Sequence, residues 1–175
     1  MAVTADVKLP SIEELTVDEV KLSGVPLRSA AFHLGKFCEW QNDEFMLCRN
    51  ELDDPRKCLS EGKAVTACTL DFFRKVKKHC RNEFENYYHC IDRSSADYDY
   101  APCRKTQSAF DKCMLDELNI ERPDFGYFSR PKIHQTKRPK PPPEQIQVFD
   151  DLPADLPEDY PRQPTKYGAR FYFYT

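Results

Sequence analysis

The sequence has no long apolar run, no glycine-rich loop and no closely spaced pair of cysteines. No stretch approaches the roughly 18 consecutive apolar residues of a membrane-spanning helix, so we expect none. With only five glycines, the chain carries no loop of the kind that cradles a dinucleotide. The C-x-x-C spacing typical of redox enzymes and of iron–sulfur sites is missing, and no two cysteines are adjacent. These absences predict a protein that is not an enzyme and binds no cofactor.

The N-terminal region also lacks the features of a targeting segment. Residues 1–28 are rich in Asp and Glu and contain no apolar core of 7–15 residues, so we expect no secretory signal. An Arg-rich, acid-poor transit peptide is equally missing. The formal net charge of −3 argues against a nucleic-acid binder, despite a short basic run from Lys132 to Lys140.

What the chain does contain is eight cysteines, all between Cys38 and Cys113. They form four C-x9-C motifs: Cys38/Cys48, Cys58/Cys68, Cys80/Cys90 and Cys103/Cys113. On an α-helix, the two sulfurs of one motif project from roughly the same side and lie about 15 Å apart along the axis. This distance is too long for a disulfide, so each cysteine must pair with a cysteine of another segment.

Folding two such helices back antiparallel selects one set of pairs. The outer cysteines of each hairpin meet, and the inner cysteines meet near the turn. We therefore predict the disulfides Cys38–Cys68, Cys48–Cys58, Cys80–Cys113 and Cys90–Cys103. The predicted fold is all-α, with two disulfide-stapled antiparallel helical hairpins and extended N- and C-terminal arms. Apolar cores this small need disulfides for stability. Each disulfide contributes about 2–4 kcal/mol to the free energy of unfolding in the chain-entropy model.

A metal site or a reactive thiol is the alternative use of these cysteines. A structural zinc site usually has two cysteines two to four residues apart, which this chain lacks. His79 and His89 precede Cys80 and Cys90 and come nearest to a mixed ligand set, although solvated histidines are the simpler interpretation. We predict no metal site, and a redox or metal-handling protein remains the alternative function.

Prolines and helical periodicity divide the chain into four expected parts. These are an extended arm (1–28), a first hairpin (29–72), a second hairpin (73–122) and a Pro-rich extended tail (123–175). Pro26 is expected to delay the first long helix to about Ser29. Ten of the fourteen prolines lie from Pro123 onward, so the tail cannot form a helical bundle of its own.

Within the hairpins, apolar residues recur at helical spacing. The first helix is expected over about 30–51 and the fourth over about 99–122. Asp54 is expected to cap the helix that begins at residue 55. No Gly or Pro lies between the second and third C-x9-C motifs, so residues 55–92 could form one rod, with a bend near residues 77–78 as the alternative.

The tail ends in a run of aromatic residues. Phe171, Tyr172, Phe173 and Tyr174 are costly to leave in water at an otherwise polar terminus. We interpret them as an anchor that binds another subunit. The rest of the tail is either a solvated linker or a strap laid across a partner.

Repeated C-x9-C motifs in helix pairs resemble the coiled-coil-helix-coiled-coil-helix family of the mitochondrial intermembrane space. Four repeats narrow the resemblance to the PGIV-type accessory subunits of respiratory complex I. It rests on the segments Leu15–Lys21, Glu44–Arg49, Leu70–Arg74, Cys103–Lys105, Arg122–Asp124 and Gly168–Phe173. The similarity extends over essentially the full chain, including both arms.

The resemblance implies a non-catalytic accessory subunit of NADH:ubiquinone oxidoreductase that braces the intermembrane-space face of the membrane arm. Implied partners are other complex I subunits and, during biogenesis, the disulfide-relay import receptor, for which Phe45, Phe72, Phe84 and Tyr87 are available. The protein would be peripheral to the mitochondrial inner membrane, with no transmembrane segment. An oxidising intermembrane space would reconcile disulfides with the lack of a secretory signal. The alternative is an intermembrane-space redox or metal-handling protein.

Overall fold

The computed structural model describes residues 8–142 together with Pro157, Asp159 and Pro161. The chain divides into two units, residues 1–141 and 142–175, and the architecture below is that of the first. All regular structure among the described residues is helical, which confirms the predicted all-α fold. The α-helices are α1 (Ile12–Leu15), α2 (Gly24–Phe37), α3 (Glu39–Leu52), α4 (Leu59–His79), α5 (Arg81–Ser94) and α6 (Arg104–Leu118).

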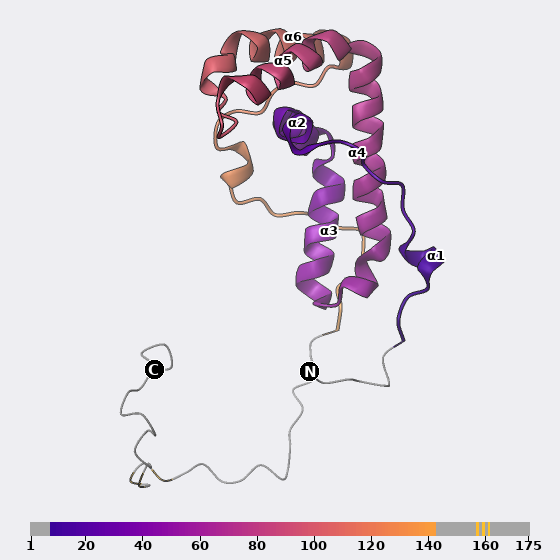
Figure 1. Cartoon of the computed structure of the whole chain (residues 1–175). Helices are drawn as coiled ribbons and strands as arrows, with labels where there is room; N and C mark the ends of the chain where they lie inside the picture. The colour runs from indigo at the N-terminus through magenta and orange to yellow at the C-terminus, as the bar shows by residue number, and fades with distance from the viewer. Residues whose placement is uncertain (1–7, 143–156, 158, 160, 162–175) are drawn as a thin grey trace. The chain divides into compact units, whose positions relative to one another are not determined.

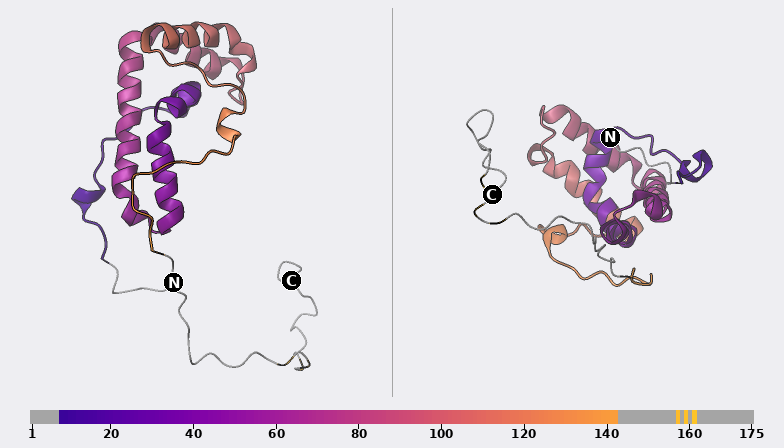
Figure 2. Two further views of the ribbon diagram at one scale, coloured as in Figure 1. Left: turned by 180° about the vertical axis from the view of Figure 1, so that it is seen from behind. Right: turned by 90° about the horizontal axis from the view of Figure 1, so that it is seen from below.

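The helices form two antiparallel pairs. α3 and α4 lie side by side, and α5 and α6 form a second pair across the C-terminal end of α4 (Figures 1 and 2). α2 packs on α5 and continues into α3, so it ties the two pairs together. Below, hairpin one means α3 with α4, and hairpin two means α5 with α6. No helix of the described part of the chain has the length and apolar character needed to cross a membrane.

Two bends separate helices that the sequence pattern left continuous. The prediction of one helix over residues 30–51 is wrong, because the backbone leaves helical geometry at Cys38 (φ −102°, ψ 23°). Likewise, residues 55–92 are not one rod, because α4 ends before Cys80 (φ −125°, ψ 31°), close to but not at residues 77–78. The amide of Cys80 still donates to the Val76 carbonyl at 2.9 Å, and the helical pattern resumes where the Phe84 amide donates to the Cys80 carbonyl at 3.0 Å.

The same backbone geometry recurs at the first cysteine of every C-x9-C motif. Cys58 (φ −109°, ψ 22°) and Cys103 (φ −103°, ψ 20°) each join a short 3-10 helix to the α-helix that follows. These dihedrals lie in the sparsely populated bridge region between helix and strand. Each of the four residues is at most 1% exposed. The first cysteine of a motif is therefore both a buried disulfide partner and a corner of the chain.

The helix ends follow local sequence signals, with two corrections. Asp54 caps the 3-10 helix Pro55–Cys58 by accepting from the Arg56 amide at 3.0 Å, as predicted. α2 begins at Gly24 rather than near Ser29, because Pro26 stands in the first turn, where a missing N–H removes no helical hydrogen bond. α6 ends at Leu118 rather than at residue 122, because Asn119 adopts a left-handed conformation (φ 53°) and caps it.

The apolar core lies where α2, the end of α4 and hairpin two meet. Its fully buried side chains include Phe72, Val76, Tyr87, Ile91, Phe110 and Met114. In contrast, the end of hairpin one at the turn between α3 and α4, which we call its distal part, buries only the disulfide of Cys48 and Cys58. Phe72 is a core residue as expected, whereas Phe45 is only half-buried. Most of the apolar packing therefore belongs to hairpin two and its junction with α2 and α4.

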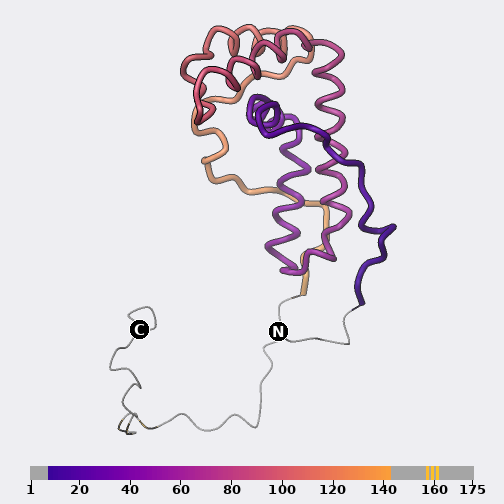
Figure 3. Tube along the Cα trace, viewed as in Figure 1, coloured from indigo at the N-terminus to yellow at the C-terminus, as the bar shows by residue number. Residues whose placement is uncertain are grey.

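Two extended segments run along the helices. Residues 16–23, on the N-terminal side, lie beside α4 (Figures 1 and 3). Residues 123–142, which we call the strap, leave α6 through a short 3-10 helix, Tyr127–Ser129, and then cross α3 (Figure 3). Residues 123–141 of the Pro-rich tail thus lie across the protein's own hairpin one.

Candidate functional site

Four disulfides close the two hairpins. Cys38 bonds Cys68 and Cys48 bonds Cys58 in hairpin one, while Cys80 bonds Cys113 and Cys90 bonds Cys103 in hairpin two. The Cα atoms of the pairs lie 5.8–6.0 Å apart, within the normal range for a disulfide. These are the pairs that the C-x9-C spacing predicts. All eight sulfurs are used, so the folded chain offers no thiolate as a nucleophile or metal ligand.

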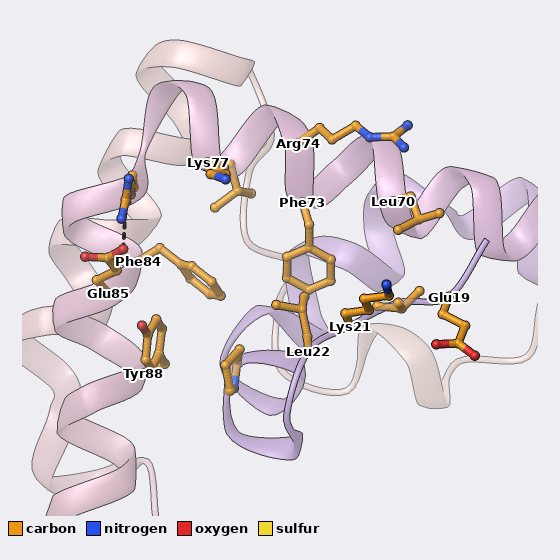
Figure 4. Close-up of a pocket in the computed structure, with 14 residues that line it drawn as sticks. Glu19, Lys21, Leu22, Leu70, Phe73, Arg74, Lys77, Phe84, Glu85 and Tyr88 are labelled. Atoms are coloured by element: carbon orange, nitrogen blue, oxygen red, sulfur yellow. Dashed lines mark hydrogen bonds and ion pairs between the residues drawn. The ribbon is translucent and has the colours of Figure 1, made fainter.

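An apolar groove lies at the bend between α4 and α5 (Figure 4). Because the chain turns at Cys80, Phe73 of α4 and Phe84 of α5 face the same cavity, with ring centroids 6.1 Å apart. Leu22 of the N-terminal arm forms another part of its wall. The groove has a volume of about 450 Å³ and carries Lys21, Arg74, Lys77 and Arg81 among its lining residues. It is an apolar surface with a mostly basic edge.

A buried histidine joins α2 to hairpin two. His33 is fully buried, with its ring edge-on to Phe110 at 5.2 Å and its Nε2 atom 3.4 Å from the Asp111 carboxylate. The pKa of His33 is lowered to about 4, mainly by burial; Asp111 opposes this shift and nearby Arg122 adds to it. Arg122 also pairs with Asp111 at 3.2 Å and lies over the Phe32 ring at 4.4 Å. The cluster fixes the start of the strap against α2 and α6.

The strap is pinned to an acidic stripe on α3. Its polar contacts are Tyr127 and Lys132 to Glu39, His134, Thr136 and Arg138 to Glu44, and Arg138 to Glu51. The Tyr127 hydroxyl donates to Glu39 at 2.8 Å, and His134 Nε2 lies 2.7 Å from Glu44. Burial raises the pKa of Glu39, but hydrogen bonds from Lys132, Tyr127 and Lys36 outweigh it and lower the pKa to about 2.

Sequence reasoning missed both the groove and the strap's place on α3. A signal for the strap was present: α3 carries acidic residues at 39, 44 and 51, and basic residues recur at even positions of the strap. The predicted aromatic anchor, Phe171 to Tyr174, lies outside the described residues. No three His, Cys, Asp or Glu side chains lie close enough to hold a metal ion in the part of the chain that the structure describes.

The aromatic residues named for import-receptor docking are mostly inside the protein. Phe72 and Tyr87 are fully buried and Phe84 is 8% exposed, while Phe45 is half-buried. In the oxidised fold, three of these four side chains are therefore closed to a receptor. Docking through them would have to precede folding.

Two helical hairpins, each closed by two disulfides between C-x9-C motifs, define the class of twin-hairpin C-x9-C proteins. A scan with models of known protein families gives no match. The chain is 32% identical over 108 residues to NADH dehydrogenase [ubiquinone] 1 alpha subcomplex subunit 8-B of Arabidopsis thaliana, covering 61% of this chain and 99% of that protein. It belongs to the family of alpha subcomplex subunit 8 of NADH dehydrogenase (ubiquinone).

Two further relatives support this assignment. Subunit 8-A of Arabidopsis thaliana is 33% identical over 90 residues, covering 51% of this chain and 82% of that protein. The 20.8 kDa subunit of NADH-ubiquinone oxidoreductase from Neurospora crassa is 33% identical over 110 residues, covering 61% of this chain. The chain spans 58% of the length of the Neurospora protein.

Proposed function

We propose that the chain is a non-catalytic accessory subunit of mitochondrial NADH:ubiquinone oxidoreductase that supports its assembly and stability. The observation that carries the proposal is the alignment with nearly all (99%) of an Arabidopsis subunit of that complex. The oxidised, thiol-free hairpins fit a scaffold, since every cysteine serves to hold helices together. The partners are other subunits of the complex, reached through surfaces such as the two extended segments.

The proposed location is the intermembrane-space face of the membrane arm, peripheral to the inner membrane. Four disulfides support an oxidising compartment, because cysteines stay reduced in reducing compartments. The eight thiols are proposed to be oxidised by the disulfide-relay import receptor during biogenesis.

The test is complementation in mitochondria that lack the endogenous subunit. The tagged chain is expected to migrate with the complex on native gels and to restore NADH:ubiquinone oxidoreductase activity. Rupture of the outer membrane should expose the chain to protease, and carbonate should extract it. A chain that restores activity without entering the complex would contradict the accessory role, and protection from protease in ruptured mitochondria would contradict the location.

Intact mass distinguishes this function from a redox or metal-handling role. Four structural disulfides predict no alkylation of the native chain and a gain of eight hydrogens on reduction. Ready alkylation of the native protein, or metal that copurifies in stoichiometric amount, would favour the alternative.

We also propose that Phe171, Tyr172, Phe173 and Tyr174 anchor the tail in a neighbouring subunit. Deleting residues 171–175 should weaken incorporation into the complex while the disulfides still form. As a matched control, replacing the four aromatic residues by leucine keeps an apolar terminus and should retain more of the incorporation. Unchanged incorporation of the deletion variant would show that the segment is a solvated linker.

A further inference from the structure

The strap has two faces of different character. Between Pro131 and Pro139 the even-numbered side chains Lys132, His134, Thr136 and Arg138 all contact the acidic stripe of α3. In an extended chain neighbouring side chains point to opposite sides, so Ile133, Gln135 and Lys137 face away from the protein. Ile133 is accordingly 95% exposed. The four side chains that bind α3 are turned inward, whereas apolar Ile133 is turned outward, with Gln135 and Lys137.

A tight turn places a second apolar side chain on the outside. The Tyr127 amide donates to the Asp124 carbonyl at 3.0 Å, and Gly126 supplies the positive φ of 79° that this turn needs. Phe125, at the tip of the turn, is 104% exposed. Its position is fixed because Tyr127 is held by Glu39.

The neighbouring residue secures the same turn. The ring of Phe128 lies so close to Gly35 of α2 that a Cβ atom there would meet it at 2.9 Å. Tyr127 and Phe128 therefore hold the turn against α3 and α2. Phe125 remains fully exposed. A large apolar side chain that is held fully exposed on a fixed turn is available for contact with a partner.

The outward face also carries positive charge and open backbone. Arg130, Lys137 and Lys140 are exposed and form no ion pair with a described residue, while Asp124 is the one acidic residue of the strap. In addition, residues 132–137 make no backbone-to-backbone hydrogen bond within the described part of the chain. The segment thus offers free N–H and C=O groups beside an apolar side chain.

We infer that residues 125–137 form a docking ribbon for a neighbouring protein subunit that has an acidic surface and two apolar pockets. Phe125 and Ile133 enter the pockets, and the backbone between Pro131 and Pro139 pairs with an extended segment of the partner. An added strand is recognised in this way, through main-chain hydrogen bonds and pockets for alternate side chains. A lipid bilayer fits less well, because its hydrocarbon offers nothing to pair with open backbone groups. The inference rests on the proposed function in one respect: the neighbour is a subunit of the same complex.

Photo-crosslinking in the assembled complex tests the ribbon. The full chain carries benzoylphenylalanine at position 133 or 125, or at position 136 as the control that faces α3, and the complex is purified after illumination. Positions 133 and 125 are expected to form an adduct with the same protein subunit, and position 136 an adduct within its own chain. Adducts with lipid, or no adduct with another subunit at position 133, would overturn the inference. If the labelled and unlabelled chains are both missing from the complex, the proposed function itself fails.

A variant pair supplies a second measurement. Phe125→Ser combined with Ile133→Ser should weaken the affinity of the chain for the complex at least about tenfold, seen as faster release in detergent solution, because both pocket contacts are lost. The control, Asn82→Ser combined with Lys105→Ser, changes exposed residues of hairpin two and should behave as wild type. Both variants should resist thiol alkylation, which reports intact disulfides. Wild-type retention of the Phe125/Ile133 variant would overturn the inference.

Discussion

The two hairpins have closely similar disulfides but very different packing of apolar side chains. The inner disulfides close sequence separations of 10 and 13 residues and the outer disulfides 30 and 33. Hairpin two nevertheless buries Phe84, Tyr87, Ile91, Phe110 and Met114, whereas the distal part of hairpin one buries only cystine. Similar disulfides therefore have different roles: they supplement an apolar core in hairpin two and replace it in the distal part of hairpin one.

This difference has a chemical origin in the sequence. α5 alternates aromatic residues with charged ones so that Phe84, Tyr87 and Ile91 share one face, toward α6 and α2. Between α3 and α4, in contrast, Phe45 rests against Gly62 rather than against another aromatic ring. The acidic stripe of α3 then binds the strap, which partly covers hairpin one from outside.

The largest expected effect is loss of a core ring from hairpin two. Phe110→Ala should lower the free energy of unfolding by about 3–5 kcal/mol, because Phe110 is fully buried among aromatic rings. The matched change in hairpin one, Phe45→Ala, should cost about 1 kcal/mol, since that ring is only half-buried. Urea denaturation of the oxidised chains measures both. Similar losses in the two variants would remove the contrast between the hairpins.

Removing one inner disulfide from each hairpin separates global from local effects. Cys48→Ser with Cys58→Ser and Cys90→Ser with Cys103→Ser each remove about 3 kcal/mol in the chain-entropy model. Hydrogen exchange should nevertheless differ. The turn region of hairpin one is expected to lose protection, because little else is buried there, while α5 and α6 keep theirs through apolar packing. Equal loss of protection in both hairpins would contradict this expectation.

Acid should weaken the junction between α2 and hairpin two through His33. Folding lowers the pKa of this side chain from its ordinary value of 6.5 to about 4, so between these values the unfolded chain binds more protons. Stability should therefore fall as the pH drops from 6.5 to 4, by roughly 2–3 kcal/mol. Urea denaturation of wild type and His33→Leu across this window measures the effect. The variant is expected to lose most of the slope, and an unchanged slope would assign it to other groups.

The smallest expected effect concerns the strap, and the change in stability should be confined to the strap and hairpin one. Glu39→Gln removes the carboxylate that Lys132 and Tyr127 bind, so it should cost about 1 kcal/mol and increase hydrogen exchange in the strap and α3. The folded pKa of Glu39 is lowered from 4.5 to about 2, so its contribution is present above pH 4.5 and is lost as the pH falls through about 2. Glu61→Gln serves as the control, because this acidic residue of α4 hydrogen-bonds Ser60 and forms no hydrogen bond or ion pair with the described residues of the strap. Faster exchange in α6 would contradict the local assignment.

Much of the scaffold could be predicted from the cysteine spacing. The motifs indicate helices, antiparallel pairing and the cysteine partners, because two sulfurs ten residues apart on the same helix cannot reach each other. The bends at Cys38 and Cys80 could not be predicted, since neither has a Gly or Pro beside it and both arise from packing between hairpins. Pro26 was also misleading, because a proline in the first turn is compatible with a helix.

The surfaces were harder to predict than the scaffold. The groove needs Phe73 and Phe84 on opposite sides of the bend at Cys80, so it could not be foreseen without that bend. Likewise, this part of the tail was expected to be either a solvated linker or a strap across a partner, but its polar side chains bind Glu39 and Glu44 of the same chain. Such long-range pairing depends on where the strap leaves α6, and Asn119 sets that point by ending the helix early.

The chain bends at Cys80, and a disulfide holds this residue in place. Cys80 ends α4, begins α5 and is bonded to Cys113 of α6. The angle between α4 and α5 therefore depends on a disulfide that forms after synthesis. A chain with that bridge open would keep the residues that favour each helix but lose the bond that locks the angle between them. Oxidation therefore sets the shape that neighbouring molecules meet, as well as the stability of the fold.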